Sequence, residues 1–202
     1  MKSLIIIDFQ YDFCDPKGTL YVKGAEEAKK GILKYMEVNN KLFNQIIYTK
    51  DWHLDKDESF KKNGGTWPDH CVQNSKGAEI DKELFDGLNK YKIQTQIVNK
   101  GTVCSHEEYG AFENIKCEDE KNKNDIKSYK FSNYELSSGA QIINNNIVVC
   151  GIAGDFCVKE SIKNLLKHWK FNLEVLVSGV ASIDNGDTLK NFMKENNLAV
   201  AQ

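Results

Sequence analysis

The 202-residue sequence contains no arginine, only two prolines and only four histidines. All 27 basic residues are therefore lysines, and with 29 acidic residues the formal net charge is -2. Such a balance argues against a nucleic-acid partner, for which clustered positive charge is expected. Because no proline- or serine-rich linker interrupts the chain, we expect a single domain over residues 1–202.

Long apolar runs are also missing. The opening MKSLIIIDFQ holds a run too short for a signal peptide, and no stretch is long enough to span a bilayer, so we expect no membrane partner. The six cysteines form no CxxC pair, which argues against zinc-ribbon and thioredoxin-like proteins. Without a secretion signal, we expect free thiols and a cytoplasmic location. The composition leaves a small molecule as the expected partner and homo-oligomers as an open possibility.

Short apolar runs instead alternate with longer amphipathic segments. Continuous apolar runs, typical of strands covered on both faces, occur at 3–9, 45–49, 95–99, 146–152, 173–179 and, more weakly, 198–201. Helix-like spacing occurs at 25–43, 136–144, 156–169 and 186–196. This alternation predicts an α/β fold, a three-layer α/β/α sandwich with a mainly parallel central sheet. The long polar segments 50–80 and 101–135 are expected to be functional loops.

Reactive side chains follow four of the predicted strands. In parallel α/β sheets the ligand lies beyond the carboxyl ends of the strands. The residues at those ends are Asp8, Asp51, His53, Lys100 and Cys157. Each has an ordinary structural explanation alone, as a helix cap, a solvated lysine or a small buried cysteine. Their coincidence indicates a catalytic site.

Cys157 is the candidate nucleophile. It lies at the start of a predicted helix, where the helix dipole and the nearby Lys100 favour thiolate over thiol. Asp8 can accept the thiol proton and return it to a leaving amine. The backbone N–H groups between Ala153 and Cys157 are placed to receive an oxyanion. The three side chains therefore form a plausible triad for attack on a carboxamide.

A second cluster has the composition of a metal site. Asp51 and His53 are two residues apart, so both project to one side of an extended segment, and His70 can supply a third ligand. Three protein ligands leave positions open, as in catalytic sites. We expect one divalent metal ion here.

These residues lie in blocks that together resemble a known family. In order and spacing, the blocks DFQYDFC, DWH, WPDHCV, KG at 100–101, EEYGAF and GIAGDFCV are similar to the nicotinamidase/pyrazinamidase branch of the isochorismatase-like cysteine hydrolases. The matched blocks run from residue 4 to about residue 180. GIAxDxCV is typical of the superfamily, whereas DWH with WPxHC is typical of the nicotinamidase branch.

The resemblance implies an activity and a mechanism. The activity is hydrolysis of nicotinamide to nicotinate and ammonia in NAD salvage, with pyrazinamide also accepted. It proceeds through a thioester on Cys157, with the backbone N–H groups of Ala153 and Cys157 as the oxyanion hole. The resemblance also implies a cis peptide bond between Ile152 and Ala153.

The resemblance further implies how the substrate binds. The aromatic ring would lie between Phe13 and Trp67, with Tyr109 as a nearby wall. The metal, held by Asp51, His53 and His70, would take the pyridine nitrogen and so orient the amide carbon toward the sulfur. These binding residues are expectations from the family pattern.

Departures from the family pattern affect the metal. Many relatives have a further histidine in DWHxxxH, where this chain has Asp57, so Asp57 or the adjacent Glu58 is a possible fourth ligand. Zinc is the expected metal, and an oxygen ligand would favour harder ions such as manganese or magnesium, with iron a further alternative. Gly154 and Phe156 replace the usual threonine and tyrosine, which removes no catalytic group.

Four other interpretations remain to be weighed. An isochorismatase-type hydrolase or a metal-independent amidase for carbamoyl substrates would need no cluster of Asp51, His53 and His70. A catalytically inactive binding protein predicts loss of part of the triad, and all three residues are present. A redox-sensing thiol protein would explain Cys157 but not the metal cluster.

Overall fold

The computed structural model describes residues 1–102, 108–112, 134–135, 141–168 and 170–202. Its centre is a six-stranded sheet in the order β3-β2-β1-β6-β7-β8, in which every neighbouring pair is parallel. The strands are β1 (Lys2–Ile7), β2 (Phe43–Asp51), β3 (Gln94–Lys100), β6 (Asn146–Ile152), β7 (Asn172–Ala181) and β8 (Ala199–Val200). The predicted parallel sheet is confirmed.

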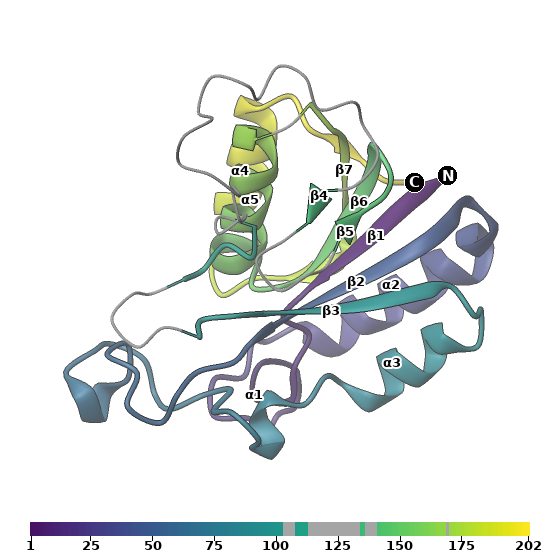
Figure 1. Ribbon diagram of the computed structural model, residues 1–202. Helices are drawn as coiled ribbons and strands as arrows, with labels where there is room; N and C mark the ends of the chain where they lie inside the picture. Colours follow the sequence, from purple (N-terminus) through teal and green to yellow (C-terminus); the bar gives the residue numbers. More distant parts are fainter. Residues whose placement is uncertain (103–107, 113–133, 136–140, 169) are drawn as a thin grey trace.

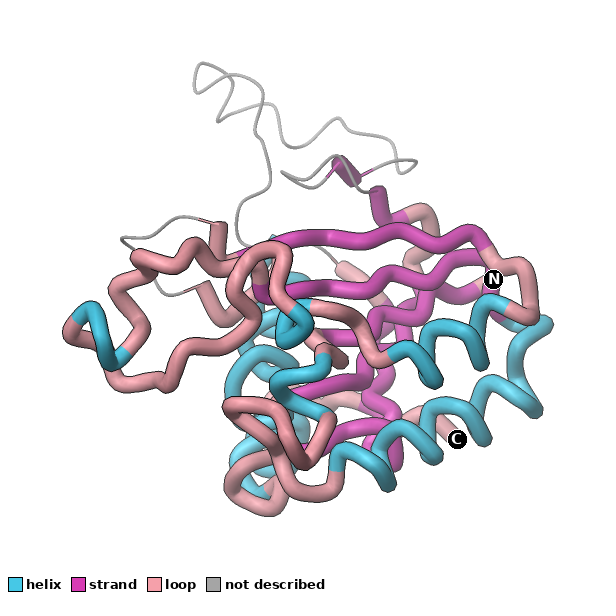
Figure 2. Tube along the Cα trace, turned by 90° about the horizontal axis from the view of Figure 1, so that it is seen from below, coloured by secondary structure: helices cyan, strands magenta, loops and turns pink. Residues whose placement is uncertain are grey.

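Helices cover both faces of this sheet (Figure 1). One face carries α1 (Tyr11–Cys14), α2 (Ala25–Asn39), which continues as η1 (Asn40–Leu42), and α3 (Lys82–Asn89). The other carries η5 (Gly154–Val158), α4 (Lys159–His168) and α5 (Asp187–Glu195). In the view from below, α2 and α3 lie on the viewer's side of the strands (Figure 2). The three-layer α/β/α sandwich is therefore confirmed.

Two apolar clusters hold the layers together. Alternate residues of β1 serve each cluster: Leu4 and Ile6 face α2 and α3, whereas Ile5 and Ile7 face α4 and α5. All four side chains are fully buried, which explains why the run is continuously apolar in the sequence. In the helix predicted at 156–169, an apolar stripe at helical spacing faces the sheet: Val158, Ile162 and Leu165 are buried and Leu166 is partly buried, while Trp169 lies outside the described residues.

The structure differs from the predicted elements in two places. The helix expected at 136–144 is wrong where it can be seen, because β5 (Gln141–Ile142) is a strand that pairs antiparallel with β4 (Tyr134–Glu135); residues 136–140 lie outside the described part. The helix α3 was not expected. It begins at an aspartate cap, since the Asp81 carboxylate accepts a hydrogen bond from the Leu84 N–H at 2.8 Å.

The predicted loop 50–80 is largely without regular structure. It contains only two short 3-10 turns, η2 (Lys61–Asn63) and η3 (Lys76–Ala78), and extends from the carboxyl end of β2 (Figure 1, blue). Most of the second predicted loop, 101–135, lies outside the described residues. No helix in the described part of the chain is long and apolar enough to cross a bilayer.

Candidate active site

The predicted catalytic residues converge at the carboxyl end of the sheet. Asp51 and Lys100 end neighbouring strands and are directly paired in register. Asp8 follows β1 with a φ of 45°, a left-handed conformation that turns the chain at the strand end. Cys157 lies in η5, directly after β6. Because β3, β2, β1 and β6 are consecutive in the sheet, all four residues reach one place.

The triad geometry is direct. Lys100 Nζ lies 2.9 Å from Asp8 Oδ2 and 3.6 Å from Cys157 Sγ. The same ammonium also donates to the Asp51 carboxylate and, at 3.1 Å, to the backbone carbonyl of Glu108. The triad side chains are at most 7% exposed. The three predicted catalytic residues are therefore in contact.

Burial sets the protonation of the nucleophile and the base. It raises the pKa of Asp8 to about 6, against the opposing effect of Lys100. It also raises the pKa of Cys157 well above its usual value, again against Lys100 and together with the carboxylates of Asp8 and Asp51. The prediction of a low-pKa thiolate is therefore wrong for the resting protein. Cys157 rests as a thiol, so it needs a base, and oxygens of Asp8 and Asp51 both lie within 4.8 Å of the sulfur. Because Asp51 belongs to the second cluster, Asp8 is the candidate base.

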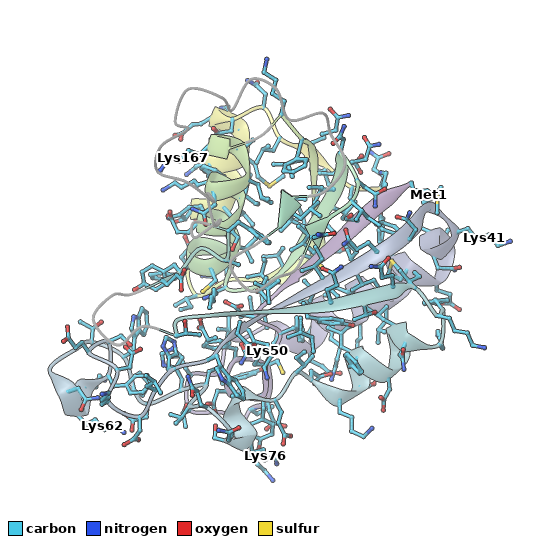
Figure 3. The ribbon with its side chains drawn as sticks, in the orientation of Figure 1. Met1, Lys41, Lys50, Lys62, Lys76 and Lys167 are labelled. Atoms are coloured by element: carbon cyan, nitrogen blue, oxygen red, sulfur yellow. The ribbon has the colours of Figure 1, made fainter. Side chains whose placement is uncertain are left out.

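At Lys100 the neighbouring charges, and not burial, determine the direction of the pKa shift. Burial lowers the pKa of Lys100, but the carboxylates of Asp51 and Asp8 outweigh that effect and raise the pKa well above its usual value. Lys100 is therefore a permanent cation. This contrasts with labelled lysines such as Lys41, Lys62 and Lys76, which lie exposed at the periphery (Figure 3).

The second predicted cluster forms in the loop after β2. The backbone of His53 pairs with the segment 71–73, because His53 N donates to the Cys71 carbonyl at 3.1 Å and Gln73 N donates to the His53 carbonyl at 2.9 Å. This pairing brings His70 beside His53, with ring centroids 4.9 Å apart. The backbone of Asp51 is fixed from both sides by the side-chain amide of Gln10. The three predicted ligands therefore lie together.

The donor atoms of this cluster fit a metal ion. Asp51 Oδ2 lies 3.7 Å from His53 Nε2 and 3.9 Å from His70 Nε2. Ligands about 2.1 Å from one ion cannot be more than about 4.2 Å apart, and both distances fall within that limit. His53 Nε2 is buried and has no hydrogen-bond partner, which leaves its lone pair for a cation. The residues present therefore fit a divalent ion.

The other ring nitrogen of each histidine is engaged. His53 Nδ1 lies 2.9 Å from Asp57 Oδ2, and His70 Nδ1 lies 2.8 Å from the carbonyl of Pro68. Both acceptors require a proton on Nδ1, so Nε2 is the nitrogen that each histidine turns toward Asp51. A glycine is needed at 101, because its φ is 64° and a Cβ there would come within 2.7 Å of the His53 ring.

The two possible fourth ligands lie elsewhere. Asp57 is buried behind His53, with one carboxylate oxygen on His53 Nδ1 and the other on the N–H of Ser59. Glu58 is exposed. Neither belongs to the group of donor atoms that Asp51, His53 and His70 form within 4.8 Å of one another. Direct ligation by Asp57 or Glu58 is thus not favoured by this arrangement.

A pocket of about 400 Å³, its open mouth included, connects the two clusters. Its walls include Cys157, Asp51 and His70 together with the three predicted substrate-binding residues, Phe13, Trp67 and Tyr109. Trp67 Nε1 donates to the hydroxyl of Tyr109 at 3.0 Å, which joins two of the aromatic walls. The pocket is thus flat-sided and aromatic, with the sulfur and a candidate cation site on its surface.

The turn that carries the nucleophile also lines this pocket. The peptide bond between Ile152 and Ala153 is cis, as the family resemblance implied. Ala153 and Cys157 both border the pocket, where the two predicted oxyanion donors reside. Asp155 fixes the facing loop, because its carboxylate accepts hydrogen bonds from the N–H groups of Ile183 and Asp184.

Sequence reasoning missed several residues of the site. Thr49 donates its hydroxyl to the Asp8 carboxylate, and the side-chain amide of Gln10 holds the backbone of Asp51. The apolar pocket walls that were missed are Leu20, Val22, Phe156 and Ile183. Among these, only Phe156 could have been predicted from the sequence, because it directly precedes Cys157 in the GIAGDFCV block. The others come from loops whose path the sequence does not indicate.

Comparisons with known proteins agree with this site. The profile of the isochorismatase domain matches residues 2–200. The nicotinamidase of Saccharomyces cerevisiae is 28% identical over 183 residues, which cover 79% of this chain and 78% of the yeast protein.

Two solved structures are also similar. PnC1 from L. infantum in complex with nicotinate has a TM-score of 0.73 at 26% identity, covering 100% of this chain and 92% of that chain. The pyrazinamidase of Pyrococcus horikoshii in complex with zinc has a TM-score of 0.71 at 25% identity, covering 100% and 98%. Because the family profile matches nearly the whole chain, the chain belongs to the isochorismatase domain family.

Proposed function

We propose that the chain is a metal-dependent nicotinamidase, which hydrolyses nicotinamide to nicotinate and ammonia and also accepts pyrazinamide. One observation carries the proposal: Cys157, whose sulfur contacts Lys100 and through it Asp8, lines the same aromatic pocket as Asp51 and His70. A metal-free hydrolase of this family has no need for the second cluster. The similarity to a yeast nicotinamidase and to a nicotinate-bound structure supports the same assignment.

The chemistry begins with the thiol of Cys157. Asp8 takes the thiol proton as the sulfur adds to the amide carbon, and the carbonyl oxygen becomes an oxyanion facing the N–H groups of Ala153 and Cys157. When the oxyanion collapses, the carbon–nitrogen bond breaks and Asp8 returns the proton to the leaving ammonia. The product of this half-reaction is a thioester on Cys157.

Water completes the cycle. Asp8 accepts a proton from a water molecule as the water oxygen adds to the thioester carbon. When nicotinate leaves, Asp8 gives the proton to the sulfur and the thiol of Cys157 is regenerated. Throughout, Lys100 stays cationic beside both Asp8 and the sulfur. It therefore stabilises the negative charge as it passes from the carboxylate to the sulfur and back.

Asp51, His53 and His70 would hold the divalent ion. When bound, the ion would supply a Lewis-acidic contact for the pyridine nitrogen and so fix the ring in the pocket. Zinc is the first candidate because two imidazoles and one carboxylate suit it, and manganese, iron and magnesium are alternatives. Phe13, Trp67 and Tyr109 would hold the ring by its apolar faces and edges.

Ammonia release tests the proposal. Nicotinamide, pyrazinamide and a carbamoyl compound are offered to the purified protein side by side, with and without a chelator. We expect release from the first two only, and its loss with the chelator. Release from the carbamoyl compound alone would reject the nicotinamidase assignment while leaving the fold intact.

The cysteine variants test the covalent mechanism. Cys157→Ala should lower turnover at least about 1,000-fold, because it removes the nucleophile, and should leave the metal content unchanged. Cys150→Ala is the matched control, since Cys150 is fully buried in β6 on the α2 side of the sheet. Turnover that survives in Cys157→Ala would reject the thioester.

We also propose that residues 1–202 form one domain and that the protein is cytoplasmic. The described residues share one central sheet, and the cysteines among them, at 14, 71, 150 and 157, are free and buried. Free thiols suit a reducing compartment. Non-reducing and reducing gels of protein taken directly from cells would compare the thiol state.

A further inference from the structure

We propose that Asp57 is a positioning residue that fixes the His53 ring and, through its charge, increases the affinity of the site for a divalent cation without ligating it. The inference rests on the metal site of the proposed function. It concerns a carboxylate four residues after His53 in the chain, which lies beside Nδ1 of that candidate ligand.

Both oxygens of the Asp57 carboxylate are engaged in hydrogen bonds. Asp57 is 1% exposed, Oδ2 lies 2.9 Å from His53 Nδ1, and Oδ1 accepts the N–H of Ser59 at 2.9 Å. Both oxygens are therefore used on the side of His53 that faces away from Asp51. A carboxylate that accepts the Nδ1 proton fixes the tautomer and makes Nε2 more basic toward a metal.

The surrounding loop holds this carboxylate rigidly. Asp57 N donates to the Leu54 carbonyl at 3.0 Å, and Asn63 Nδ2 donates to the Asp57 carbonyl at 2.7 Å. The fully buried ring of Phe60 contacts the rings of both His53 and His70 edge-on, with centroids 5.5 and 5.4 Å away. The segment 54–63 thus forms a preformed support for the histidines.

The charges of the site point to a divalent cation as the balancing group. Its buried carboxylates are those of Asp8, Asp51 and Asp57. Lys100 contributes one ammonium in contact with the first two. The formal sum of these four groups is -2, so a divalent ion makes the site neutral, which a low-dielectric environment favours.

The two histidines are consequently not equivalent. His70 Nδ1 donates to a neutral acceptor, the carbonyl of Pro68, whereas His53 Nδ1 faces a carboxylate. Removal of the Asp57 charge should therefore weaken the bond to the cation through His53 without removing a ligand. Loss of affinity with unchanged stoichiometry is the signature of such an outer-sphere role.

The experiment compares Asp57→Asn with Asp55→Asn. Asp55 lies in the same loop with its side chain 84% exposed and paired to Lys62, so its variant removes an equal charge without touching His53. Zinc affinity is measured by competition with a chromophoric chelator. We expect Asp57→Asn to bind one zinc ion per chain 10- to 100-fold more weakly, the usual effect of an outer-sphere partner, and Asp55→Asn to bind like the wild type.

A second measurement needs no variant and stands even if Asp57→Asn fails to fold. Nitrogen-15 NMR of the zinc-loaded wild type should show His53 protonated on Nδ1 and metal-bound through Nε2. A proton on Nε2, or equal zinc affinity for the two variants, would overturn the inference. Nicotinamide turnover by the wild type reports separately on the proposed function, which survives if the enzyme is active and binds zinc while the Asp57 variant is unaffected.

Discussion

At the scale of single residues, Lys100 connects the two halves of the site. Its ammonium contacts the carboxylates of Asp8 and Asp51 and the sulfur of Cys157, at 2% exposure. Removal of this cation leaves two buried carboxylates without their partner. The penalty for breaking a buried pair in this way exceeds the net value of the pair itself.

Lys100→Met should therefore unfold more easily as well as lose activity. We expect the free energy of unfolding to fall by about 3–5 kcal/mol, measured by urea denaturation at neutral pH. Lys30→Met is the matched control, because the Lys30 side chain is 68% exposed and should tolerate the change. Equal free energies of unfolding for the two variants would mean that the contacts of Lys100 with Asp8 and Asp51 do not stabilise the fold.

Asp8 makes a prediction about pH. Burial raises its pKa to about 6, and only the ionised form can accept the proton of Cys157. Since protonation removes the base, kcat/KM should decline as the pH falls through about 6 and below, by tenfold per unit at the limit. The measurement is kcat/KM for nicotinamide against pH with saturating metal.

The alternative gives a different profile. If Cys157 ionised without a base, the rate would still rise through about pH 8, where a free thiol titrates, and further. That outcome would contradict the role of Asp8. Asp8→Asn should then retain activity, whereas general-base catalysis predicts a loss of about 100- to 10,000-fold.

The sequence predicted which residues meet but not how they are charged. Asp8, Lys100 and Cys157 could be found because each follows a recognisable strand, and parallel strands end together. The thiolate expected at Cys157 is absent because burial outweighs the lysine, and burial depends on side chains from distant segments. Asp57 was seen as a candidate ligand because spacing gives no information on which side of His53 it lies.

At the scale of elements, α2 lies unusually close to β7. Two glycines face each other across this contact: a Cβ on Gly31 would come within 1.9 Å of the Ser178 carbonyl, and a Cβ on Gly179 within 2.7 Å of Ile32. The absence of both side chains allows the helix to approach the strand. Helix propensity and packing therefore make opposite demands at Gly31.

Gly31→Ala tests which demand prevails. Propensity alone predicts about 1 kcal/mol of stabilisation, whereas overpacking against a backbone carbonyl costs about 1–3 kcal/mol. Because the Ser178 carbonyl is a backbone group of β7 and not the end of a flexible side chain, we expect net destabilisation in thermal and urea unfolding. Gly87→Ala is the control, since in α3 the added methyl meets only the end of the Leu33 side chain. A more stable Gly31→Ala would contradict the close contact.

Elements with two-sided burial were the most predictable. The strand expected at 146–152 is β6, with the same bounds. It could be predicted because both of its faces are buried, so its sequence is a continuous apolar run. By contrast, α3 is only eight residues long, buries only Leu84 and Leu88 and contains a glycine, so the sequence offers few apolar positions from which to predict it. The Asp81 cap was the available signal for that helix. At 141–142 local spacing indicated a helix, but pairing with β4 prevailed.

At the scale of the whole molecule, strand order assembles the site. Asp8, Asp51, Lys100 and Cys157 are far apart in the chain, but they follow strands that are neighbours in the order β3-β2-β1-β6. Sequence patterning predicts the parallel sheet and the edge at which its ligands lie. It does not predict strand order, because order depends on which crossovers pack best against both faces. The strand ends therefore predicted that the two clusters share one edge of the sheet, but not which residues would be in contact there.

The charge gathered at that edge predicts how metal affects stability. The buried carboxylates of Asp8, Asp51 and Asp57 exceed the single ammonium of Lys100, so we expect the folded chain to bind a divalent ion for which the unfolded chain has no site. Binding to the folded state alone stabilises it by about 2.7 kcal/mol at a free concentration 100 times Kd. For a chain of this size that amounts to a rise of about 5–10 °C in Tm.

Zinc titration of chelator-treated protein, followed by calorimetry, measures this rise. His70→Ala removes one ligand and should abolish most of the shift, while Asn74→Ala, in an exposed turn of the same loop, should retain it. A chelator should reverse the shift in the wild type. An equal shift in wild type and His70→Ala would place the bound zinc elsewhere on the protein. Absence of any shift would mean that the buried negative charge is tolerated without a cation, and would remove the metal from the proposed mechanism.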